Sequence, residues 1–96
     1  MSCLHLVNRP LAASHLKQLQ QRMTEQDALI MIEDACYMAT DSELSELMSE
    51  IKPYLLQIDA SIRGIEPRAP YLNLVADYGE LVELTLTFDK VLTWAQ

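Results

Sequence analysis

The chain has 96 residues, which is enough for one domain and too few for two. Half of its residues are hydrophobic, and it contains only 2 Gly and 4 Pro, so the composition favours a folded core over disorder. The net charge of −7, from 14 acidic residues against 7 Lys and Arg, argues against direct binding to nucleic acid, which needs clustered cations.

The sequence also indicates a compartment. Two cysteines, Cys3 and Cys36, are too few for a disulfide framework. The first apolar run is broken by Asn8, Arg9 and Pro10, unlike a signal peptide, and no apolar run approaches the length of a membrane span. We therefore expect a cytoplasmic protein with reduced thiols and no membrane segment.

The first half of the chain alternates between strand and helix patterns. A strand is predicted at Cys3–Val7, apolar apart from His5, and Asn8–Pro10 is a turn. A helix is predicted from about Leu11 to Met23, with Pro10 near its start. One apolar stripe supports this helix, formed by Ala12, Leu16, Leu19 and Met23. The five apolar residues Ala28–Ile32 predict a second strand, buried on both faces.

Capping residues divide the middle of the chain. Asp34 is a plausible N-cap for a short helix at Ala35–Ala39, and Asp41 with Ser42 for a helix at Glu43–Glu50. Proline then ends that helix, and Tyr54–Ile58 is the third predicted strand.

A loop-rich segment follows. Asp59 is predicted to cap one helical turn at Ala60–Arg63, and Gly64 to close that turn. After two further prolines, Tyr71–Ala76 is apolar and predicted to be extended.

The segment Val82–Phe88 fits two structures. Its strict alternation is a strand pattern, whereas Asp77 and Glu80 before it form a capping box that predicts a helix. We favour the helix, because it keeps strands and helices alternating up to the last strand, Val91–Trp94. Such an alternation predicts a small three-layer α/β domain with a mainly parallel sheet.

Cys36 carries the side chain that is best suited to a chemical reaction. It follows a buried strand, and ligands collect at the carboxyl ends of strands in open α/β sheets. A helix N-terminus would lower the pKa of its thiol, while Glu33 and Asp34 would act in the opposite direction. Cys36 is thus a candidate sulfur carrier, and a packed thiol is the interpretation we favour.

Other common sites find no support. The turn after the first strand, Asn8-Arg9-Pro10-Leu11, lacks the glycines that a nucleotide phosphate needs, and no acid ends that strand to hold magnesium. Cys3 and His5 share a strand face but lack a third metal ligand, so we interpret them as a core cysteine and a hydrogen-bonded core histidine. No cofactor and no metal are expected.

Four segments resemble, in order and spacing, the motifs of one family: Leu4-His5-Leu6-Val7-Asn8-Arg9, Asp27 to Ala39, Tyr54-Leu55-Leu56-Gln57-Ile58-Asp59 with Arg63-Gly64, and Asp77-Tyr78-Gly79-Glu80-Leu81-Val82-Glu83-Leu84 with the closing Trp94. The family that they resemble is DsrH/TusB. Ala35 and Cys36 stand where the family usually has Gly and Val. Some DsrH members carry a cysteine in the first helix, and Leu11–Met23 has none.

The resemblance implies a single DsrE/F/H-like domain over residues 1–96. It implies a TusB-like subunit of a cytoplasmic sulfur-relay complex, a dimer of heterotrimers with TusC-like and TusD-like subunits, which passes persulfide sulfur toward 2-thiolation of the tRNA wobble uridine. The relay cysteine resembles one on the TusD-like subunit, so this chain is expected to be structural rather than catalytic.

Three alternatives stay open: a DsrH-like subunit in sulfur oxidation, a stand-alone thiol sulfurtransferase using Cys36, and a homo-oligomeric binding module. Candidate partner contacts, for which core packing is an equal explanation, are Met31, Tyr37, Met38, Leu44, Met48, Leu84 and Phe88.

Overall fold

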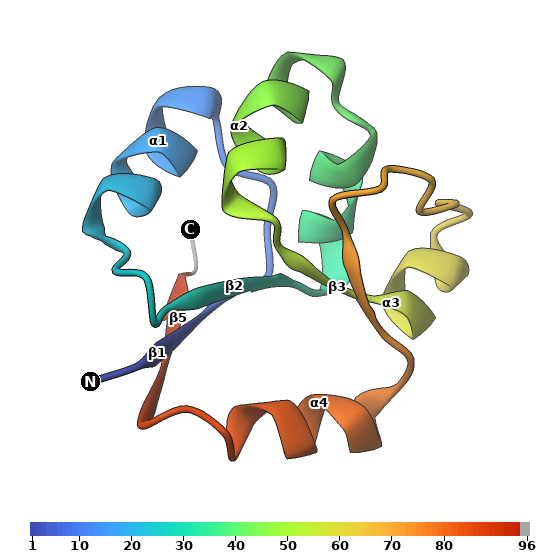
Figure 1. Ribbon diagram of the computed structural model, residues 1–96. Coiled ribbons are helices and arrows are strands. Elements are labelled where there is room, and N and C mark those ends of the chain that lie inside the picture. Colours follow the sequence, from blue (N-terminus) through green and yellow to red (C-terminus); the bar gives the residue numbers. More distant parts are fainter. Residues whose placement is uncertain (95–96) are drawn as a thin grey trace.

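Five parallel strands form one sheet in the order β4-β3-β2-β1-β5 (Figure 1). The computed structural model describes residues 1–94. The strands are β1 Cys3–Val7, β2 Ala28–Met31, β3 Tyr54–Leu56, β4 Asn73–Val75 and β5 Lys90–Trp94. At the carboxyl end of β1, Val7 pairs with Met31 on one side and Trp94 on the other. The predicted α/β fold is confirmed, and the sheet is parallel throughout the described chain.

Helices cover both faces of the sheet and make three layers. The helices are α1 Ala13–Arg22, α2 Ser45–Ile51, α3 Gln57–Ile62 and α4 Tyr78–Thr85, with two 3₁₀ segments, η1 Glu33–Thr40 and η2 Ser42–Leu44. Figure 1 shows α1 and α2 on one side of the sheet and α4 on the other. None of the helices in residues 1–94 has the length and apolarity that crossing a membrane would need.

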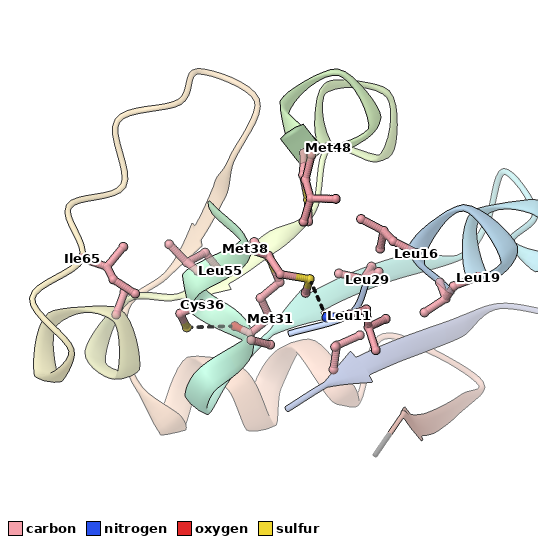
Figure 2. Close-up of a cluster of buried hydrophobic side chains, with 14 residues drawn as sticks. Leu11, Leu16, Leu19, Leu29, Met31, Cys36, Met38, Met48, Leu55 and Ile65 are labelled. Carbon is pink, nitrogen blue, oxygen red and sulfur yellow. Dashed lines mark hydrogen bonds between the residues drawn. The ribbon is translucent and has the colours of Figure 1, made fainter. Parts of the chain in front are cut away.

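The larger core lies between the sheet, α1, η1 and α2 (Figure 2). Leu16 and Leu19 of the predicted stripe are buried in it. Leu11 is buried there too, and its backbone N–H donates to the sulfur of Met38 at 3.3 Å. Helix α1 begins at Ala13, two residues later than predicted, because its N-cap Ala12 has an extended backbone.

A smaller core lies on the α4 side of the sheet. Leu4, Ile30, Leu56 and Val75 are its buried members, and the half-buried Leu81, Leu84 and Phe88 pack against them. Val7 contributes to the larger core and Leu4 to the smaller one, because side chains at odd spacing along a strand lie on opposite faces.

The segment Val82–Phe88, whose sequence fits both a strand and a helix, begins as a helix. The Asp77 carboxylate accepts from the backbone N–H of Glu80 at 3.0 Å, and the Glu80 carboxylate accepts from Ala76 at 3.3 Å. The helix interpretation is thus confirmed as far as Thr85, and a turn follows. The hydroxyl of Thr85 donates to the carbonyl of Val82, so this β-branched residue is accommodated in the helix.

Two predicted caps are wrong. Asp34 lies inside η1, which begins one residue earlier at Glu33, and Asp59 lies inside α3, which begins at Gln57. Both carboxylates bind partners distant in sequence instead of their own helix ends. Gly64 closes α3 as predicted: its φ is 70°, and Ile65 donates to the carbonyl of Ala60 at 2.9 Å.

The outer strand β5 is unusually exposed. Parallel strands are typically covered on both faces. In β5, however, Val91 and Leu92 point to opposite faces and are 41% and 47% exposed. This part of the sheet therefore lacks a covering layer from residues 1–94.

Candidate functional site

A polar cluster lies where β2 and β3 end. The carboxylate of Asp59 accepts from the backbone N–H of Glu33 at 2.7 Å and from the hydroxyl of Tyr78 at 2.6 Å. Asp59 is only 3% exposed, so its buried charge is satisfied by these donors. The three residues belong to α3, η1 and α4, and Asp59 thereby joins elements from both sides of the sheet.

Glu33 enters this cluster in a left-handed backbone conformation, with φ of 50°. Such a conformation is uncommon outside glycine and costs free energy. The hydrogen bond to Asp59 offsets that cost, because it fixes the Glu33 N–H in the orientation that the turn requires.

Arg63 closes the outer side of the cluster. Its Nε donates to the Asp34 carboxylate at 2.8 Å, and another guanidinium nitrogen donates to the carbonyl of Asp59 at 3.1 Å. This hydrogen bond to the Asp34 carboxylate is the main reason that the pKa of Arg63 is raised above its ordinary value. The guanidinium is held by partners within this chain.

Cys36 lies beneath this cluster, in the larger core (Figure 2). It is fully buried, and its thiol donates to the carbonyls of Met31 and Leu56, at 3.7 Å and 3.9 Å. Burial raises the pKa of the thiol to about 12, the charge of Asp59 adds to this, and Arg63 opposes it in part. At pH 7 roughly one such thiol in 10⁵ is ionised.

The structure separates the other candidate residues into two groups. Met31, Met38, Leu44 and Met48 are buried in the larger core, so their side chains pack inside the subunit. Leu84 and Phe88 are half-buried against the smaller core. Tyr37, on η1, is 46% exposed and lies on the surface.

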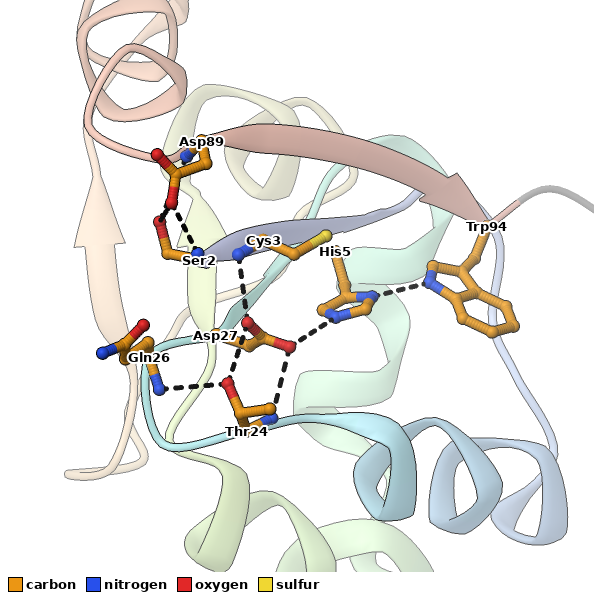
Figure 3. Close-up of polar contacts among 8 residues, drawn as sticks. All are labelled: Ser2, Cys3, His5, Thr24, Gln26, Asp27, Asp89 and Trp94. Carbon is orange, nitrogen blue, oxygen red and sulfur yellow. Dashed lines mark hydrogen bonds and ion pairs between the residues drawn. The ribbon is translucent and has the colours of Figure 1, made fainter.

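A second polar network centres on His5 (Figure 3). The indole Nε1–H of Trp94 donates to Nδ1 of His5 at 3.0 Å. An indole nitrogen can only donate, so Nδ1 carries the lone pair, and the ring proton on Nε2 faces the Asp27 carboxylate at 3.3 Å. His5 is 5% exposed and is the hydrogen-bonded core histidine that the sequence predicts.

Asp27 is the anchor of this network. Burial by itself would raise the pKa of its carboxyl group. Hydrogen bonds from the Thr24 backbone, His5, the Cys3 backbone and the Thr24 hydroxyl outweigh that effect and lower the pKa below its ordinary value. The carboxylate of Asp27 therefore stays ionised at neutral pH.

The sequence points to some of these hydrogen-bond partners and not to others. A polar His5 in an apolar strand indicates that some partner exists, and Asp27 directly before the neighbouring strand is a candidate for it. No local pattern points to Trp94, 89 residues away, or to Tyr78 as a partner of Asp59.

Fold and site together define a class of protein: a small α/β domain with a parallel sheet, in which a polar cluster around Asp59 lies over a buried thiol. Within residues 1–94, no three His, Cys, Asp or Glu side chains are grouped so as to hold a metal ion. The family model for DsrH-like proteins matches residues 9–91, and the chain belongs to that family.

A solved structure agrees with this assignment at the level of the fold. The ychN protein from E. coli superposes with a TM-score of 0.67 at 17% sequence identity, over 98% of this chain and 100% of its own. Comparison with curated proteins gives no match. Family membership makes this chain a sulfur-relay-related protein, and DsrH-like proteins act in multi-subunit sulfur-relay complexes.

Proposed function

We propose that this chain is a structural subunit of a cytoplasmic complex that relays persulfide sulfur for 2-thiolation of the tRNA wobble uridine. Its partners are TusC-like and TusD-like subunits, arranged as a dimer of heterotrimers. The observation that carries the non-catalytic role is the burial of both cysteines of the chain, with Cys3 4% exposed and Cys36 fully buried.

Sulfur relay sets a chemical requirement that these cysteines do not meet. An acceptor thiolate attacks the outer sulfur of a persulfide, the S–S bond breaks, and the donor leaves as a thiolate. The attacking group must therefore be ionised and accessible. Cys36, with a pKa of about 12 and no exposed surface, is neither, so the relay thiol is assigned to a partner subunit.

Exposed apolar side chains supply the surface for assembly. Tyr78, Val82 and Leu86 are 53%, 58% and 79% exposed and recur every four residues, from the first residue of α4 to its C-cap. Val91 and Leu92 add apolar area on β5. An apolar surface of this kind on a small subunit is typical of a protein–protein interface. Tyr37 stays a further candidate contact.

The acidic balance of the chain fits this role better than tRNA binding. A surface with net charge −7 repels phosphates, so contact with tRNA is assigned to other members of the complex.

Co-expression with TusC-like and TusD-like subunits tests the assembly. The chain is expected to elute with both partners as one complex in size-exclusion chromatography. Separate elution of this chain would reject the subunit role and leave the homo-oligomeric module.

Intact mass measurement tests the assignment of the thiol. After incubation of the complex with a persulfide donor, the added sulfur is expected on the TusD-like subunit and not on this chain. One extra sulfur on this chain, lost in Cys36→Ser, would instead identify a sulfurtransferase.

The pathway is tested in cells. Deletion of the gene is expected to abolish 2-thiouridine at the wobble position of tRNA, and the intact gene to restore it. Unchanged tRNA thiolation together with impaired sulfur oxidation would overturn the tRNA assignment.

A further inference from the structure

A small hollow lies between α1 and the end of β5. Leu11, His15, Gln18, Arg22 and Trp94 line its volume of about 220 Å³. Three of its lining residues belong to α1, which lies on the side of the sheet opposite to α4 (Figure 1).

The side chains that line this hollow differ in charge from those of three others. Three other hollows in the described chain are each lined by two or three acidic side chains: Glu43, Glu46 and Glu50 in one, Glu80 and Glu83 in another, and Glu25, Asp27 and Glu50 in the third. The hollow beside Trp94 is lined by no acid and by one arginine. Helix α1 contains no acidic residue at all, although the chain carries 14.

The arginine of this hollow lies over an indole ring that the buried network of His5 orients. Asp27 orients His5, and His5 accepts the indole N–H of Trp94 (Figure 3). The guanidinium carbon of Arg22 lies 5.7 Å from the centroid of the Trp94 ring. A guanidinium over an aromatic ring can still pair with a planar anion through its N–H groups.

We propose that this hollow binds a carboxylate of an acidic peptide segment from a partner protein. Arg22 pairs with the carboxylate, Gln18 and His15 surround it with polar atoms, and Leu11 and Trp94 contact the apolar part of the peptide. The hollow has room for about one side chain. A nucleic acid is a poorer occupant, because one arginine meets one anionic group and the surrounding acidic surface repels a polyanion.

The single tryptophan of the chain provides a direct test, because Trp94 gives the one indole N–H signal in a ¹⁵N–¹H NMR spectrum. The full chain is titrated with a short amidated peptide of alternating Leu and Glu, and with the same peptide carrying Gln in place of Glu. The acidic peptide is expected to shift the indole signal with saturation, and the Gln peptide to leave it unchanged.

Two matched variants locate the interaction. Arg22→Gln is expected to weaken binding about tenfold or more, since it removes a hydrogen-bonded charge. Lys17→Gln removes the same charge from the same helix, but Lys17 lines a different hollow, and binding is expected to stay unchanged. Far-UV circular dichroism checks that both variants are folded.

Three results would overturn the proposal. The first is an indole signal that does not saturate with the acidic peptide. The second is an equal loss of binding in Lys17→Gln, which would indicate general charge attraction. The third is saturation by inorganic phosphate at the same concentration as the peptide, which would identify a generic anion site.

Discussion

The hydroxyl of Tyr78 donates to the buried carboxylate of Asp59 at 2.6 Å, and this bond joins α4 on one side of the sheet to α3 at its carboxyl edge. The same carboxylate holds the left-handed Glu33 at the end of β2. One carboxylate thus orders three segments that are separated by many residues. The fully buried thiol of Cys36 lies close to these contacts, because it donates to the carbonyl of Leu56 at the end of β3.

Asp59→Asn is expected to destabilise the fold by about 1–3 kcal/mol. The amide oxygen can still accept from Glu33, but both charge-assisted hydrogen bonds are lost, and the Tyr78 hydroxyl must accept from the amide N–H instead of donating. Urea unfolding monitored by circular dichroism measures the change in the free energy of unfolding.

Asp34→Asn is the matched control. Asp34 also accepts a hydrogen bond, from Arg63, but its side chain is 63% exposed, so water can replace the bond. An equal loss of stability in both variants would contradict the importance that we assign to the buried carboxylate of Asp59.

Asp27→Asn is expected to lower stability by about 1–3 kcal/mol at pH 7, because Asp27 accepts hydrogen bonds from three residues in the folded state. The pKa of Asp27 is lower in the folded than in the unfolded protein. Its charged form therefore stabilises the fold above the unfolded pKa, about 3.9, and this contribution is lost as the pH falls through the folded value.

The difference in the free energy of unfolding between the Asp27→Asn variant and the natural chain should accordingly shrink below about pH 4. Unfolding curves from pH 7 to pH 3 measure it. Glu25→Gln, at an exposed neighbouring position, should stay within about 0.5 kcal/mol of the natural chain. If the loss of unfolding free energy in Asp27→Asn did not depend on pH, this would argue against an ionised Asp27 carboxylate.

Cys36 is expected to resist alkylation in the folded protein. A pKa of about 12 in place of 9.0 lowers the thiolate fraction about 1,000-fold near neutral pH, and burial blocks access as well. Reaction of the Cys3→Ala variant with iodoacetamide, with and without urea, isolates Cys36 and measures the ratio of rates. Comparable rates in the two conditions would show that the thiol is accessible and would reopen its role as a sulfur carrier.

Val82→Glu is expected to weaken assembly with the partner subunits without unfolding the chain. Val82 is 58% exposed, so its replacement should change stability by no more than about 0.5 kcal/mol, while a charge in an apolar interface is costly. Co-elution with TusC-like and TusD-like subunits is the measurement. Gln21→Glu adds the same charge on α1 and should leave co-elution intact. Normal assembly of Val82→Glu would exclude this side of α4 as the interface.

Local patterns predicted the local parts of this structure. The strands around His5, Leu29 and Leu92 follow from apolar runs, and the cap at Asp77 from its spacing to Glu80. These features depend on neighbours within a few residues.

The predicted roles of Asp34 and Asp59 were wrong because their partners are distant in the sequence. Each has the sequence context of a helix cap, but tertiary contacts with Arg63, Glu33 and Tyr78 decide its role. The sequence also could not show whether the methionines around Cys36 lie in the core or at an interface. An apolar side chain at helical spacing fits both, and only the packing of helices on the sheet shows that these side chains are buried.

The pairing of β1 with β5 affects how the chain folds during synthesis. Strand β1 lies inside the sheet, yet one of its two neighbours is the last strand of the described chain, and Ser2 is hydrogen-bonded to Asp89, 87 positions later (Figure 3). While the ribosome is still translating, one edge of β1 therefore stays open to pairing with other chains. A truncated product that ends before Lys90 would keep that edge open, so it should aggregate or be degraded, and only chains that include β5 would be available for assembly.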